Sequence, residues 1–252
     1  EPAKARFLQK GLRHTLDNAN ALITDSEFTR QELASFSGWP LEKIHAIPLA
    51  SSPEFHPRGE SEVWPVINKY DLNYRGYTLY VGTIEPRKNL GRLLDAYGRM
   101  PLELRRRWPL VLSGYKGWRS DEIHLRVRDA ERQGWARYLG FVPAAELPLL
   151  YAGARVFVFP SLYEGFGLPV LEAMSSGVPV ICSNSSSLPE VAGNAALMSE
   201  PLDVVGMSEN LAYGLQNDAW RDQAIARGME RAQSLSWGRC VRGTIAVYRR
   251  FD

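Results

Sequence analysis

Short apolar runs alternate with segments of helical period along most of the chain, and this alternation limits the fold more than any other feature. The apolar runs are predicted to be strands and occupy residues 78–84, 109–115, 136–142, 156–161 and 179–183. The helical segments between them occupy residues 89–100, 121–134, 145–154 and 168–177, and a loop is predicted after the last strand. Strands and helices that alternate in this way predict an α/β fold, with a parallel sheet covered by helices on both faces.

The stretch before residue 51 contains too few elements to enclose a core of its own. Residues 2–19 are predicted to form a helix and residues 21–24 and 44–49 two short strands, with Ser26 capping a second helix after the first strand. These elements have the α/β pattern, but they are too few to bury a core. We therefore predict that residues 1–50 are the tail of another α/β domain whose main part lies upstream.

A segment rich in Pro, Ser and Gly at residues 50–60 interrupts the periodicity and predicts a linker. The alternating elements after this linker predict one complete α/β domain over residues 51–235. The chain ends in successive helical patterns at residues 204–217, 219–235 and 236–251. We treat the last of them, residues 236–252, as a separate C-terminal helix.

Composition and charge exclude several classes of protein. The 252 residues are 45% apolar and 23% charged, as in ordinary globular proteins, and no apolar run reaches the roughly 20 residues that a membrane span needs. The net charge of +2 does not indicate a nucleic-acid partner. The arginines at 105–107 favour a solvated helix face, with peripheral contact to an anionic membrane surface as the alternative.

The cysteines and histidines indicate neither a disulfide framework nor a metal centre. Cys182 and Cys240 lie in apolar surroundings and lack the spacing of a zinc site, which favours a reducing, cytoplasmic compartment. The four histidines show no i, i+4 pair and no HExxH motif, so we expect no metal ligands among them.

The loop after the first strand of the large domain reads EPRKN and places Arg87 next to Lys88. Ligands of open parallel sheets bind outside the carboxyl ends of the strands, which is where this loop lies. Asn89 is predicted to cap the following helix with its side chain. A guanidinium and an ammonium beside a helix N-terminus suit a diphosphate, because charges and free N–H groups converge on one anion. A solvated turn is the alternative.

The segment YEGFGLPVLEAM carries two carboxylates, Glu164 and Glu172, on either side of a glycine-rich turn. Gly165 and Gly167 allow close approach of a ligand to the backbone, and a helix is predicted to start near Leu168. A glycosidase would need both acids aimed at one bond, whereas these flank a phosphate-binding turn. We predict that one acid binds a sugar and the other a ribose; a helix-face carboxylate is the alternative for Glu172.

With these motifs in this order, the sequence resembles the retaining, nucleotide-sugar-dependent glycosyltransferases of family four, which have the GT-B fold of two facing Rossmann-like domains. The resemblance covers nearly the whole chain and rests on ITDSEFTRQEL, LYVGTIEPRKNLGRLLDAY, LSGYKGW, the segment from LGFVPAAE to GNAAL, and SWGRCVRGTIAVYRRF. The pair of glutamates with seven residues between them, together with the upstream Arg-Lys pair, is specific only in combination.

The resemblance implies a role for each matching residue, because the C-terminal domain of that family binds the activated donor. Arg87 and Lys88 are expected to bind the diphosphate and to stabilise the leaving group without a metal ion. Glu172 is expected to bind the ribose hydroxyls and Glu164 the transferred sugar. The backbone amides expected at the donor are those of Gly165, Phe166, Gly167 and Leu168, and the base is expected beside Phe141 and Val142.

The sequence also departs from the family pattern. The family's acceptor-binding domain, with a histidine that positions the transferred sugar, would lie upstream of residue 1. The linker reads PLASSPEF, where many relatives have an Asn-Gly pair. The resemblance further implies that the helix from Ser236 crosses back onto the upstream domain. We therefore expect the chain to be a donor-binding half that transfers sugar poorly by itself.

The expected function is transfer of a hexose, with mannose favoured, from a nucleoside-diphosphate sugar to a glycan or lipid-linked acceptor in polysaccharide biosynthesis. The donor is a substrate, and no cofactor is expected. We expect the enzyme in the cytoplasm, with the inner face of the membrane as an alternative location. Two alternatives stay open: a nucleotide-sugar 2-epimerase of similar architecture, and a sensor or adaptor that binds sugar nucleotides without catalysis.

Overall fold

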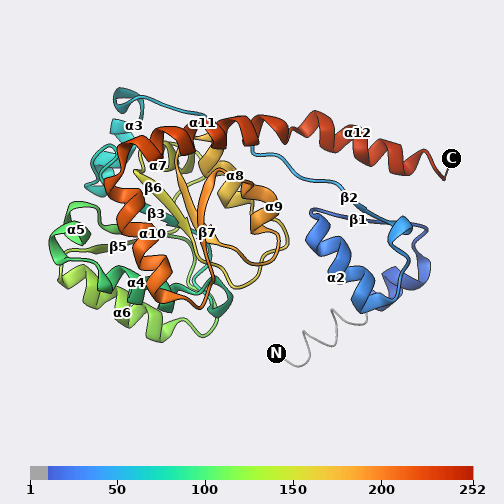
Figure 1. Cartoon of the computed structure of the whole chain (residues 1–252), viewed down its shortest axis with the longest axis horizontal. Helices are drawn as coiled ribbons and strands as arrows, with labels where there is room; N and C mark the ends of the chain where they lie inside the picture. Colours follow the sequence, from blue (N-terminus) through green and yellow to red (C-terminus); the bar gives the residue numbers. More distant parts are fainter. Residues whose placement is uncertain (1–10, 252) are drawn as a thin grey trace.

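The computed structural model describes residues 11–251, and its largest part is a parallel six-stranded sheet between two layers of helices (Figure 1). The strand order is β5-β4-β3-β6-β7-β8. Their bounds are β3 Thr78–Val81, β4 Leu110–Ser113, β5 Ala136–Gly140, β6 Val156–Phe159, β7 Val180–Ser183 and β8 Ala196–Ser199. Strand order reverses at the neighbouring strands β3 and β6, so the loops that leave their carboxyl ends diverge around a crevice.

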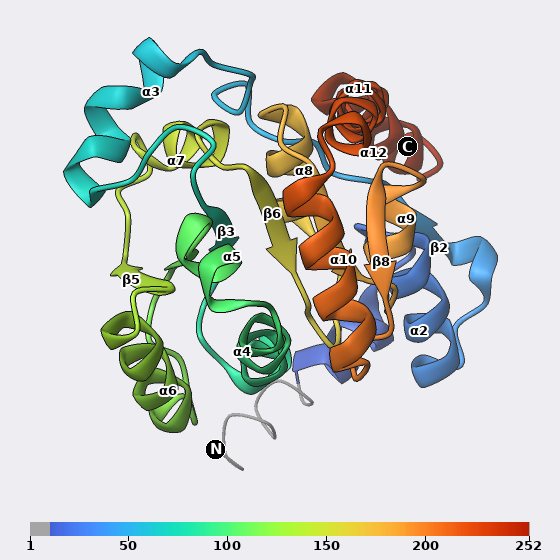
Figure 2. The ribbon, with the colours of Figure 1, turned by 60° about the vertical axis from the view of Figure 1, so that its left-hand side comes forward.

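Helices cover both faces of this sheet, as Figure 2 shows. One layer contains α4 Leu90–Arg99, α5 Leu102–Arg107, α6 Asp121–Arg132 and α10 Val204–Gln216. The other contains α3 Glu60–Ile67, α7 Leu147–Ala152, α8 Leu168–Ser175, α9 Leu188–Ala192 and α11 Asp218–Ser234. Because both faces are covered, the four residues of β6 are all buried, which explains its uninterrupted apolar sequence VFVF. The prediction of a Rossmann-like α/β fold is confirmed.

Several short elements were not predicted from the sequence. The loop expected after residue 183 contains α9 and the strand β8, and α3 and α5 were also missed. Each is too short for a periodic pattern: α9 has five residues, and α3 contains Pro65 within its eight. The short 3-10 helices are η1 Leu41–Lys43, η2 Asn68–Tyr70 and η3 Pro86–Lys88.

A smaller unit precedes the large sheet and lies beside it in Figure 1. It contains a helical segment at residues 11–18, then β1 Leu22–Thr24, α2 Glu27–Ser37 and β2 Ile44–Ala46, with β1 and β2 paired in parallel. The predicted cap is confirmed, since the Ser26 side chain accepts from the Thr29 N–H at 3.1 Å. The part of the predicted first helix before residue 11 lies outside the described residues.

The C-terminal helix α12 Trp237–Tyr248 leaves the large unit and runs along the smaller one (Figure 1). The Trp237 indole N–H donates to the Ser51 carbonyl at 3.1 Å, and a Cβ placed on Gly243 would lie 3.2 Å from the Ile47 side chain. The helix therefore contacts the residues that join the two units. The crossing of this helix onto an upstream domain and the assignment of residues 1–50 to an acceptor-side domain both stay predictions.

The arginine cluster at 105–107 lies on α5, but it is not simply a solvated face. The guanidinium of Arg105 packs 5.0 Å from the Trp135 ring centre, and that of Arg107 packs 4.5 Å from the Trp108 ring centre. These arginines therefore help to cover the edge of the core. Between residues 11 and 251, no helix combines the length and the apolar character required for a membrane span.

Candidate active site

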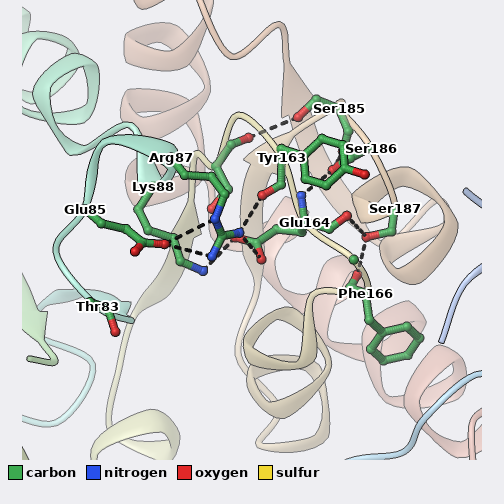
Figure 3. Close-up of polar contacts among 12 residues, drawn as sticks. Thr83, Glu85, Arg87, Lys88, Tyr163, Glu164, Phe166, Ser185, Ser186 and Ser187 are labelled. Atoms are coloured by element: carbon green, nitrogen blue, oxygen red, sulfur yellow. Dashed lines mark hydrogen bonds and ion pairs between the residues drawn. The ribbon is translucent and has the colours of Figure 1, made fainter. Parts of the chain in front are cut away.

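The loops that follow β3 and β6 bring the predicted charged residues together at the carboxyl edge of the sheet (Figure 3). Lys88 Nζ lies 2.7 Å from Glu164 Oε1, and Arg87 Nη1 lies 2.7 Å from Glu164 Oε2. One carboxylate thus accepts from both cations. Lys88 and Glu164 are each 8% exposed, so their mutual attraction acts in a region of low dielectric constant.

Additional partners hold the guanidinium of Arg87 in the same place. Arg87 Nη2 donates to Glu85 Oε1 at 2.9 Å, and Nη1 donates to the Tyr163 carbonyl at 2.6 Å. Burial by itself would lower the pKa of Arg87, but the hydrogen bonds and charges of Glu164 and Glu85 outweigh it and raise the pKa above its ordinary value. Arg87 is therefore a fixed positive charge at this edge.

Asn89 has a different role from the one predicted. It lies at the start of α4 in the left-handed conformation, with φ of 61°, and its side chain makes no capping hydrogen bond. Instead its Nδ2 donates to the carbonyls of Pro160 and Pro201, at 3.0 and 2.6 Å. The predicted side-chain cap was wrong, because Asn89 connects the Arg-Lys loop to the loop after β6. This connection fixes the distance between the two loops.

Glycines allow the loops after β3 and β4 to run against each other. Gly114 has φ of 147°, and a Cβ there would lie 2.0 Å from the carbonyl oxygen of Gly82. Further along, Ile84 and Lys116 form an isolated parallel bridge. The backbone that leads to Arg87 and Lys88 is therefore supported by the neighbouring loop, and only glycine fits at the contact.

Serines after β7 support the loop that carries Glu164. The N–H of Glu164 donates to Ser186 Oγ at 2.8 Å, and the Ser187 hydroxyl donates to the Phe166 carbonyl at 2.7 Å (Figure 3). The sequence alone predicts only a loop for this stretch. The signal that could have located them is the run of serines directly after an apolar strand, where side chains reach the carboxyl edge.

The residues whose backbone amides were predicted at the donor, Gly165 to Leu168, lie in different surroundings. Gly167 has φ of 108° and precedes α8, which begins at Leu168 as predicted. The carbonyl of Gly165 accepts from the hydroxyls of Ser26 and Thr29. The side chain of Phe166 is buried in the core, so only the backbone of this residue is available to a ligand.

Glu172 does not join the ion-pair cluster of Glu164. Its carboxylate accepts a hydrogen bond from the Tyr151 hydroxyl of α7, with 3.0 Å between the oxygens. Burial raises the pKa of Glu172 above its ordinary value, and the hydrogen bond from Tyr151 only partly opposes this shift. The two glutamates thus occupy separate environments.

The predicted base neighbours also differ from each other. Phe141 is 58% exposed and stacks on Tyr115 with ring centres 4.8 Å apart, whereas the Val142 side chain is 3% exposed and belongs to the core. Only Phe141 presents a side chain to solvent. Tyr115 was not predicted as a base neighbour, although its segment, LSGYKGW, is one of those that carry the family resemblance.

Comparison with known proteins places the chain in a family. The glycosyl transferases group 1 family matches residues 68–231. The chain is 49% identical over 246 residues to O-antigen chain mannosyltransferase B of Escherichia coli, covering 98% of this chain and 65% of that protein. It is 32% identical over 227 residues to the serotype-specific mannosyltransferase WbdA of Escherichia coli, covering 88% of this chain and 28% of that protein.

A solved structure shows the same arrangement of strands and helices. Sucrose-phosphate synthase from Thermosynechococcus elongatus superposes with a TM-score of 0.79 at 25% identity, covering 93% of this chain and 59% of that chain. The chain therefore spans only part of the length of each of these proteins. On the extent of the family match and the fold, the chain belongs to the group 1 glycosyl transferases, and its sheet is that of a GT-B glycosyltransferase.

Proposed function

We propose that this chain supplies the nucleotide-sugar site of a retaining glycosyltransferase that transfers a hexose in polysaccharide biosynthesis. The observation that carries the proposal is the cluster of Arg87 and Lys88 around Glu164, at the point where strand order reverses. Mannose is the favoured hexose, because the relatives named above are mannosyltransferases. The acceptor is a glycan or a lipid-linked glycan.

Donor binding in this proposal exchanges one anion for another. The diphosphate takes the place of the Glu164 carboxylate at Arg87 and Lys88, and the amides at the start of α8 donate to its oxygens. Glu164 is then free to accept hydrogen bonds from the sugar. As the bond to the sugar breaks, negative charge grows on the leaving diphosphate, where the two cations stabilise it without a metal ion.

In this proposal the ribose and the base of the donor contact side chains on either side of the diphosphate. Glu172 accepts from the ribose hydroxyls, and the base lies against the exposed stack of Phe141 and Tyr115. The half-buried position of Glu172 suits this role, because a carboxylate partly shielded from water makes stronger hydrogen bonds to hydroxyl groups.

Calorimetric titration of this chain with GDP, UDP and ADP tests the site. We expect one of them to bind, and Arg87→Ala to weaken binding by about 1.5–3 kcal/mol, roughly tenfold or more, because a charge-assisted contact is lost. Arg132→Ala is the matched control, since Arg132 is an exposed arginine of α6 paired with Asp129. If Arg87→Ala and the parent chain bind the nucleotide with equal affinity, Arg87 does not bind the diphosphate.

Glu172→Gln is expected to stabilise the chain near neutral pH and to weaken nucleotide binding. The pKa of Glu172 is raised in the folded state, so the folded chain carries the cost of a partly desolvated charge once the pH exceeds the ordinary carboxyl pKa of 4.5. The neutral amide removes this cost and still accepts from Tyr151. Thermal unfolding should show no gain below pH 4.5 and a gain that grows as the pH rises through the folded-state pKa. A variant that melts lower at neutral pH contradicts this prediction.

A further inference from the structure

The start of α2 is held by a carboxylate that lies far from it in the sequence. Glu190 Oε1 accepts from the N–H of Glu27 at 2.9 Å, and Glu190 Oε2 accepts from the N–H of Phe28 at 3.2 Å. These are the first two amides of α2, which have no partner inside the helix. The negative charge also suits the positive end of the helix dipole. Glu190 of α9 therefore caps a helix of the smaller unit.

The same end of α2 contacts the loop that carries Glu164. The hydroxyls of Ser26 and Thr29 both donate to the Gly165 carbonyl, at 2.6 and 2.9 Å. The ring of Phe28 packs edge-on against the ring of Tyr163, with centres 5.4 Å apart. A carbonyl that accepts two hydroxyl groups is held in position more firmly than one exposed to water.

These contacts continue directly into the candidate active site. Gly165 follows Glu164 in the chain, and the Tyr163 carbonyl accepts from Arg87 Nη1 at 2.6 Å. On the other side, the backbone of α9 is itself anchored, because Arg231 of α11 donates to the carbonyls of Glu190 and Val191 at 2.7 and 3.0 Å. A fixed helix end thus connects α11, α9, α2 and the loop of Glu164.

We propose that Glu190 is a positioning residue that fastens the start of α2 onto residues 163–166 and thereby sets the position of the Glu164 carboxylate. We call the contacts of Glu190, Ser26, Phe28 and Thr29 the α2 clasp. In this proposal the Glu164 carboxylate is held in position for the sugar only while α2 of the smaller unit contacts residues 163–166. The consequence for sugar binding rests on the proposed function, whereas the mechanical coupling does not.

The proposal predicts different effects on the binding of two parts of the donor, the nucleoside diphosphate and the sugar. Arg87, Lys88 and Glu172 do not contact Glu190, Ser26, Phe28 or Thr29 directly, and Arg87 keeps its bond to Glu85, so nucleoside diphosphate binding should survive loss of the clasp. Glu164 lies between the two loop residues that the clasp holds, Tyr163 and Gly165. Loss of the clasp should therefore remove the added affinity that the sugar of a sugar nucleotide contributes.

Amide hydrogen exchange of the full chain tests the mechanical part, with Glu190→Gln as the variant. A glutamine leaves one acceptor oxygen and places an NH₂ group against a donor, so exchange at Glu27 and Phe28 should rise about tenfold. The proposal expects exchange at the Glu164 amide to rise as well. Glu230→Gln, which removes the same charge from α11, is the control and should change neither.

The exchange result decides between positioning and a local capping role. Faster exchange confined to α2, with the Glu164 amide unchanged, would overturn the proposal. The double variant Ser26→Ala, Thr29→Val breaks the clasp from the other side and should expose the Glu164 amide to the same degree as Glu190→Gln. Glu190→Asp retains the charge and should restore part of the protection at residues 163–166.

Titrations with GDP and GDP-mannose test the consequence for the sugar. In the parent chain the sugar nucleotide should bind more tightly than the nucleotide, and Glu190→Gln should abolish this difference while the affinity for GDP stays within about twofold. A retained sugar increment in Glu190→Gln would overturn the consequence. If the parent chain binds neither of these ligands and neither UDP nor ADP, the proposed function fails, and the exchange measurement still decides whether the α2 clasp positions the loop.

Discussion

Gly114→Ala is expected to lower the free energy of unfolding by more than about 3 kcal/mol, which is at the severe end for a single methyl group. The added Cβ would lie 2.0 Å from the carbonyl oxygen of Gly82 and 2.6 Å from its carbonyl carbon. Both contacts are with backbone, so no side-chain rotation relieves them. Gly114 also has φ of 147°, a conformation that strains any residue with a Cβ. The loops after β3 and β4 must separate.

Separation of the loops after β3 and β4 should impair ligand binding as well as stability. The loop after β3 continues through Ile84, which bridges Lys116, to Arg87 and Lys88. We therefore expect Gly114→Ala to lose measurable nucleotide binding, assessed by calorimetry alongside chemical unfolding. Gly98→Ala is the matched control, because nothing lies within 4 Å of the new Cβ and Gly98 is inside α4. That variant should gain about 0.5–1 kcal/mol; similar behaviour of the two variants would refute the close-contact argument.

Lys88→Met is expected to destabilise the chain by about 3 kcal/mol and to remove nucleoside diphosphate binding. Methionine keeps the apolar contact over the Phe159 ring, where the ammonium lies 4.8 Å from the ring centre, but it leaves the Glu164 carboxylate without its buried partner. Arg87 still pairs with Glu164, which limits the loss. Urea unfolding gives the free energy, and calorimetry gives the affinity.

A double-mutant cycle separates the ion pair from simple packing. Glu164→Gln alone leaves Lys88 uncompensated, whereas Lys88→Met with Glu164→Gln removes both charges. The double variant should cost less than the sum of the single variants by about 1–3 kcal/mol. Lys69→Met is the control for an exposed pair, because Lys69 is bonded to Glu146 at the surface, and it should cost less than about 1 kcal/mol. Strict additivity at Lys88 and Glu164 would mean that the buried pair contributes nothing.

The sequence was sufficient for the fold because its strongest signals are local. The apolar runs at β3, β4, β6 and β7 and the helical period of α4 and α6 follow from burial on both faces of a parallel sheet, which any window of the chain reveals. The same topology predicted that the site lies on loops that leave the carboxyl ends of the strands. Local sequence patterns do not predict β8 and α9, because segments of four or five residues fit several conformations equally well.

Arg87, Lys88 and Glu164 lie together in the structure, but their pairing was not predicted. The sequence placed Arg87 and Lys88 on a phosphate and Glu164 on a sugar, and it contained no signal that the three form one ion-pair cluster. Asn89 illustrates the reason. An Asn at a helix start is the expected cap, yet tertiary contacts with Pro160 and Pro201 take its amide. The partners of a polar side chain depend on segments that are distant in sequence.

The two crossings between the units limit how they can move. The linker after Ile47 and the helix α12 pass between the units side by side, and they touch through the bond from Trp237 to Ser51 (Figure 1). A chain with one connection can swivel about any axis, whereas two adjacent connections leave rotation about the line through them as the soft direction. The soft direction is therefore a rotation about an axis near Trp237 and Ser51, and the α2 clasp is the contact that such a rotation would break.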